Sequence, residues 1–176
     1  MPSFASRLFR AVAAALVIIV ALLGLFWFLG ANQAALSDAT RQLGQGDVSL
    51  LQPYVDDLWN RLLQTAILSM LVPLVFGLGW VFLVERAPPI GDASAKAKRG
   101  SWAIMLLVTW LVVGVLVWAS LIYAAIAVTM APGLGVQCLL AGELAATLLY
   151  YLVTALGVFP PSRVSVPGGN ALLGGR

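Results

Sequence analysis

The chain of 176 residues has no histidine, a single cysteine and few charged residues, which make up 10% of the sequence. Without histidine, neither a Ser-His-Asp hydrolase nor an imidazole-based metal site is possible. Cys138 has no second cysteine in the chain with which to form an internal disulfide. The sequence also carries no cofactor-binding motif. We therefore expect a protein that is not an enzyme, with no catalytic residues, no cofactor and no metal ion.

Basic residues outnumber acidic ones, and the net charge is +3. A nucleic-acid-binding protein gathers its lysines and arginines on one face. Here they are scattered over the connections between apolar segments, so we expect no nucleic-acid partner. The basic excess is better explained by membrane topology.

Hydrophobic residues make up 61% of the chain, and the mean hydropathy is +0.99. A helix needs about 20 apolar residues to cross the hydrocarbon core of a bilayer, and four windows satisfy this length. The sequence therefore predicts an all-α membrane protein. The expected spans are residues 11–30, 62–84, 102–128 and 136–159, joined by an outer loop (31–61), a basic cytoplasmic loop (85–101) and a tight outer turn (129–135), with an N-terminus (1–10) and a flexible tail (160–176).

The first apolar segment, residues 11–30, follows two arginines and so resembles a secretory signal. Its apolar core is longer than the roughly 7–15 residues of a cleavable signal peptide. No clean small-x-small cleavage site follows it. We therefore expect an uncleaved span.

Orientation follows from the side on which the basic residues lie, because cytoplasmic loops are enriched in lysine and arginine. With the N-terminus inside, eight of the ten basic residues are cytoplasmic and two, Arg41 and Arg61, are outside. Both termini are then cytoplasmic. This bias and the small size are typical of a multi-pass protein of a bacterial inner membrane.

The outer loop contains an amphipathic pattern at residues 50–61. Leu51, Tyr54, Val55 and Leu58 recur at three- and four-residue intervals, with polar residues between them. The pattern predicts a short helix at the outer membrane surface, or a projecting first turn of the second span. Such a helix packs on its own bundle or docks a partner.

Glu143 is the ionisable residue inside a predicted span. It shares a helical stripe with Thr147, Tyr150 and Thr154, which we expect to point into the bundle. A charged carboxylate at that depth is costly, so we expect Glu143 to be mostly neutral near pH 7. Our hypothesis is a buried polar cluster, whose residues are Glu143, Tyr123, Ser69, Thr147 and Tyr150.

Small residues at helical spacing predict surfaces on which helices approach closely. Ser69, Pro73 and Gly77 are four residues apart on the second span, and Gly142 and Ala146 are four apart on the fourth. We expect these five residues to pack against neighbouring helices.

Function follows mostly from what the chain does not have. The leading hypothesis is a non-enzymatic integral subunit or scaffold of a larger cell-envelope complex, of secretion, transfer or respiratory type. Its expected partners are the lipid bilayer and other membrane subunits, or further copies of itself. The alternative is a small oligomeric transporter or channel with Glu143 as its ion or proton site.

Overall fold

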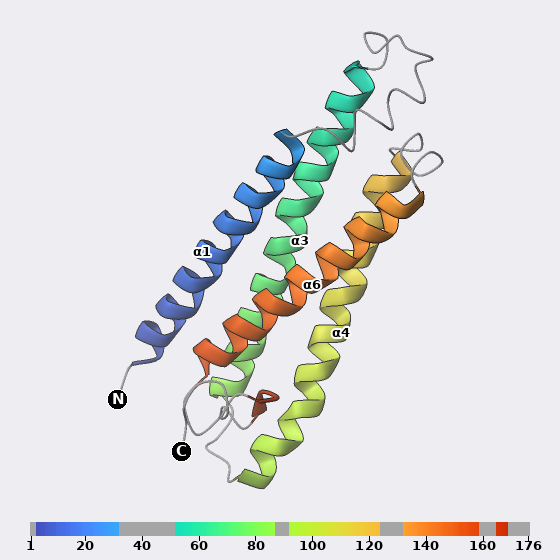
Figure 1. The fold of residues 1–176 in the computed structure, drawn as a ribbon. Helices are drawn as coiled ribbons and strands as arrows, with labels where there is room; N and C mark the ends of the chain where they lie inside the picture. The colour runs from blue at the N-terminus through green and yellow to red at the C-terminus, as the bar shows by residue number, and fades with distance from the viewer. Residues whose placement is uncertain (1–2, 32–51, 87–91, 124–131, 159–164, 169–176) are drawn as a thin grey trace.

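The computed structural model describes residues 3–31, 52–86, 92–123, 132–158 and 165–168. Four long helices account for nearly all of this part, and it contains no strand. They are α1 (Phe4–Ala31), α3 (Gln52–Arg86), α4 (Asp92–Tyr123) and α6 (Pro132–Gly157) (Figure 1). The all-helical fold predicted from the sequence is confirmed.

Each helix contains a segment that is long and apolar enough to cross a membrane. These segments are Phe4–Phe28, Asn60–Arg86, Lys98–Ser120 and Cys138–Gly157. The four segments are therefore compatible with a multi-pass membrane protein. Each of them overlaps one of the four predicted spans. The orientation of the termini stays a prediction.

All four helices begin earlier than the predicted spans, and α6 does so by four residues, at Pro132. Ser3 caps α1, because its hydroxyl accepts a hydrogen bond from the backbone N–H of Ser6 at 3.2 Å. Helix α3 begins at Gln52, so residues 52–61 run without a break into the second span. Helix α4 begins at Asp92, within the segment expected to be a loop. Whether the start of α3 lies at a membrane surface stays a prediction.

The four helices form a bundle in which α6 packs against each of the other three (Figure 1). Helices α1 and α4 lie on opposite sides of the α3–α6 pair. The first turn of α1 and the last turns of α3 and α6 lie at the same end, which we name the terminal end. We name the other, where α1 ends and α3 begins, the loop end.

The core is built in layers along the bundle. At the terminal end, Trp80, Trp102 and Tyr150 are buried with Val158 and Val166. A middle layer follows around Ile19, Leu149 and Val153. The layer toward the loop end contains Leu62, Val113, Val117 and Ala146. Every layer combines residues from distant parts of the chain.

Residues 165–168 are the described part of the tail predicted for residues 160–176. Ser165 and Val166 are fully buried, and Val166 belongs to the core layer with Trp80 and Trp102. Burying a valine side chain is favourable by about 1.5–3 kcal/mol relative to leaving it exposed. This gain explains why the short segment lies against the helices.

Candidate functional site

Polar side chains of α6 face α4 and form a series of contacts along the interface of these two helices. The indole N–H of Trp110 donates a hydrogen bond to the hydroxyl of Thr147 at 2.9 Å. The same hydroxyl donates to the backbone carbonyl of Glu143 at 2.8 Å. The threonine therefore serves as acceptor for one helix and donor within its own.

Toward the terminal end, the same interface is fully buried. The indole N–H of Trp102 donates to the hydroxyl of Thr154 at 3.0 Å. The hydroxyl of Tyr150 donates to the backbone carbonyl of Trp102 at 3.2 Å, and the two aromatic rings lie 5.2 Å apart. We name these contacts, with the pair Trp110–Thr147, the α4–α6 ladder. The stripe predicted from helical spacing thus makes its hydrogen bonds to other helices with α4, while the ring of Tyr150 also contacts α3 near Gly77.

Glu143 lies one turn beyond Thr147, toward the loop end. Its Oε1 atom is 3.4 Å from the position that a Cβ atom on Gly114 would occupy. Its Oε2 atom is buried and has no hydrogen-bond partner among the described residues. The neighbouring residues Leu140 and Leu144 are exposed on the outside of the bundle. The carboxyl therefore lies at the edge of the α4–α6 interface, with one oxygen unsatisfied.

Ser69 occupies a different place. It contributes to the wall of a cavity that all four helices line, together with Gly142, Ala141 and Ala145. Its Oγ atom is buried, also without a hydrogen-bond partner within the described part of the chain. Beside it, the hydroxyls of Thr65 and Ser120 form a hydrogen bond between α3 and α4. Ser69 and Glu143 share no hydrogen bond in this part.

The predicted cluster of Glu143, Tyr123 and Ser69 is not tested as a whole, because the side chain of Tyr123 lies outside the described residues. The residue of α4 that lies against Glu143 is Gly114, nine positions before Tyr123. Thr147 and Tyr150, the remaining members, both belong to the α4–α6 ladder.

Two of the five predicted packing residues, Gly77 and Gly142, lie close to a neighbouring helix. A Cβ atom added to Gly77 would be 3.1 Å from Cγ1 of Val153, and one added to Gly142 would be 3.5 Å from Cγ2 of Val117. Pro73 and Ala146 are fully buried. Absence of a side chain at Gly77 therefore permits the close approach of α3 and α6.

The tightest contact at a glycine that the structure describes was not predicted. A Cβ atom on Gly157 would be 2.7 Å from Cγ2 of Val81, a distance at which the valine side chain or the helices must shift. The signal in the sequence is weak, since Gly157 has no small residue four positions before it and precedes the Pro160-Pro161 pair.

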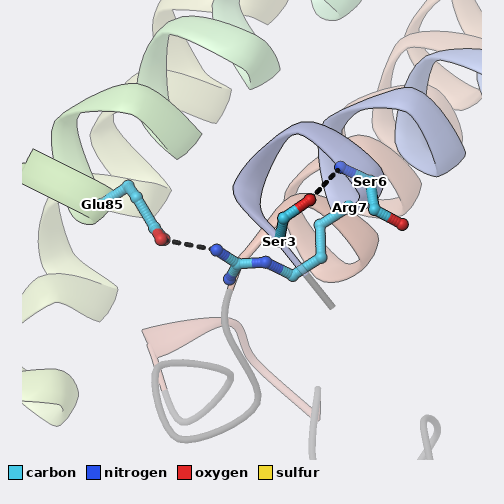
Figure 2. Close-up of polar contacts among 4 residues, drawn as sticks. All are labelled: Ser3, Ser6, Arg7 and Glu85. Carbon is cyan, nitrogen blue, oxygen red and sulfur yellow. Dashed lines mark hydrogen bonds and ion pairs between the residues drawn. The ribbon is translucent and has the colours of Figure 1, made fainter. Parts of the chain in front are cut away.

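A second contact missed by sequence reasoning joins α1 to α3 at the terminal end. A guanidinium nitrogen of Arg7 donates to a carboxylate oxygen of Glu85 at 2.5 Å (Figure 2). The side chain of Arg7 is 7% exposed and that of Glu85 is 28% exposed. The sequence offers only a weak signal for this contact, because it shows a basic residue, Arg7, before the first span and an acidic residue, Glu85, after the second.

The Arg7 site also includes aromatic rings. The guanidinium lies 5.8 Å from the ring centroid of Phe4, and this ring packs edge-on against Phe82 at 5.3 Å. Arg7 thus anchors the start of α1 to the end of α3 through an ion pair and an apolar contact.

The described residues contain no group of three or more metal-ligating side chains. No family model matches the sequence. Comparison with curated proteins gave no match, and comparison with solved structures gave none either.

Proposed function

We propose that this chain is a non-enzymatic integral subunit or scaffold of a larger cell-envelope membrane complex. We further propose that it resides in a bacterial inner membrane with both termini in the cytoplasm. The observation that carries the proposal is the carboxyl of Glu143 at the edge of the α4–α6 interface, beside the exposed Leu140 and Leu144. A carboxyl in hydrocarbon is costly without hydrogen-bond partners, so a partner helix that packs on this edge and covers it stabilises the group.

The use of the other polar groups supports this proposal. The hydroxyls of Thr65, Thr147, Tyr150 and Thr154 are all engaged in hydrogen bonds. These hydrogen bonds join α3 to α4 and α4 to α6, and the groups line no polar passage in the described part of the chain. Glu143 lies at the edge of the α4–α6 interface, where a neighbouring subunit can pack.

Glu143→Leu and Glu143→Gln test the proposal. The tagged chain is extracted from its own membranes with a mild detergent, and the mass of the native particle is measured. We expect wild type and Glu143→Gln to travel with other proteins, because the amide also forms hydrogen bonds. We expect Glu143→Leu to lose them while keeping its helical content.

Gln64→Leu is the matched control, since Gln64 is an exposed polar residue of the second span outside the α4–α6 ladder. It should leave the complex intact. A wild-type chain that purifies alone, or as a homo-oligomer of one component, contradicts the subunit proposal.

The alternative function, an ion- or proton-coupled transporter, rests on the same carboxyl, because ionisable groups within spans often bind the transported ion. Against it, the described cavity is apolar and Glu143 does not line it. Reconstituted vesicles test it directly. A flux that Glu143→Ala abolishes would favour transport over the subunit proposal.

A further inference from the structure

The cavity between the four helices lies near the loop end and has a volume of about 230 Å³. The cavity exists because the residues that α6 contributes at this level have small side chains. Ala141, Gly142 and Ala145 line it, whereas Leu149 and Val153, further along the same helix, are fully buried and fill the middle layer. Helix α6 therefore leaves space where its side chains are small.

The wall of the cavity is apolar. Large apolar side chains from three helices line it, among them Leu22 and Phe26 of α1, Met70 of α3 and Val117 of α4. The hydroxyl of Thr65 is engaged by Ser120 and by the carbonyl of Arg61, and the Oγ atom of Ser69 is covered. A stable internal water needs two to four polar partners, which this wall does not present.

The cavity is also open to the outside of the bundle. Among its lining residues, Leu25 of α1 is 54% exposed and Ala141 of α6 is also exposed. All the lining residues lie within the four membrane-spanning segments, so the surrounding solvent is hydrocarbon rather than water.

The size of the cavity restricts its occupant. An apolar cavity of about 150 Å³ holds a benzene molecule, whereas a helix with its side chains is about 10 Å across. At about 230 Å³ the space is large enough for a segment of hydrocarbon chain and too small for another helix.

We propose that this cavity binds one hydrocarbon chain of a membrane phospholipid, which enters beside Leu25 and Ala141 and contacts Met70 at the inner wall. The chain replaces the van der Waals contacts that Ala141, Gly142 and Ala145 do not supply. This binding site does not depend on the role proposed for Glu143, because that carboxyl is not part of the wall.

Photo-crosslinking of the full chain tests the site. The protein is placed in nanodiscs of dioleoylphosphatidylcholine, a fraction of which carries a diazirine in one acyl chain. Met70 is 7% exposed, so an adduct on it reports a chain inside the cavity. We expect Met70 adducts in wild type. They should fall about tenfold in Ala145→Leu, equal to roughly 1.4 kcal/mol of lost binding.

Ala141→Leu narrows the mouth of the cavity at an exposed position and should lower the Met70 adducts too. If Ala145→Leu does not fold, the Met70 adducts of Ala141→Leu still test whether the cavity binds a hydrocarbon chain. Ala119→Leu is the control, because Ala119 is exposed on α4 and is not among the lining residues. It should behave as wild type.

Two results overturn the proposal. One is a folded wild-type protein with no Met70 adducts, or with adducts that Ala141→Leu and Ala145→Leu leave unchanged. The other is a crosslink from a bifunctional reagent on Cys138, which also lines the cavity, to a second copy or another protein seated there.

Discussion

Arg7 and Glu85, 78 positions apart in the chain, form a 2.5 Å ion pair that ties the first turn of α1 to the last turn of α3 (Figure 2). Arg7 is buried, and the carboxylate of Glu85 compensates its charge. The contact of α1 with α3 is otherwise limited, and α1 packs mainly on α6.

We expect Glu85→Gln to destabilise the protein by about 3 kcal/mol, the lower end of the loss for a broken buried ion pair. The lower end applies because Glu85 is partly exposed. Unfolding in mixed detergent micelles measures the change. Arg86→Gln, at the exposed next residue, is the control and should change stability little. Equal effects of the two variants would show that the ion pair contributes nothing.

The contact between Gly157 and Val81 predicts a strong effect of a single methyl group. Gly157→Ala places a Cβ atom 2.7 Å from a methyl group of a valine, whose side chain is stiff. We expect a loss of about 1–3 kcal/mol, typical of overpacking. Gly79→Ala is the matched control, since no atom lies within 4 Å of its added Cβ. A thermal melt in which both variants match wild type would contradict the observed packing.

The buried part of the α4–α6 ladder can be tested by removing one hydroxyl. Thr154→Val keeps the shape of the side chain but leaves the indole N–H of Trp102 without its acceptor. We expect a loss of about 1 kcal/mol, within the range for hydrogen bonds between membrane helices. A double-mutant cycle with Trp102→Phe measures the coupling between the two residues. A coupling of zero would mean that this hydrogen bond does not stabilise the bundle.

The proposed orientation predicts which residues a membrane-impermeant thiol reagent reaches. In a Cys138→Ala background, Ser37→Cys in the predicted outer loop should react in intact cells. Ser3→Cys, before the first span, should react only after the membrane is opened. Labelling of Ser3→Cys in intact cells would reverse the proposed topology.

The sequence alone determined those features that depend only on residues near one another in the chain. Hydrophobicity over about 20 residues defines a span without reference to the rest of the chain, so four spans were predicted and four apolar helices are present. The stripe through Thr147, Tyr150 and Thr154 was equally accessible, because the helical period places these residues on one face. Helix starts were less predictable, since a first turn that contains polar residues, such as Ser6 and Arg7 in α1, lies outside the continuous apolar run.

The tertiary structure decided which helix each face meets. Glu143 lies against Gly114, and Ser69 lines a cavity with Ala145; the cluster predicted for them with Tyr123 stays a prediction. The helical period predicts on which face of its own helix a residue lies. It does not predict which other helix packs against that face or which residues of that helix come opposite, because both depend on how the four helices pack together. For the same reason the Arg7–Glu85 pair, the Val81–Gly157 contact and the cavity beside Ala141 appear only in the folded chain.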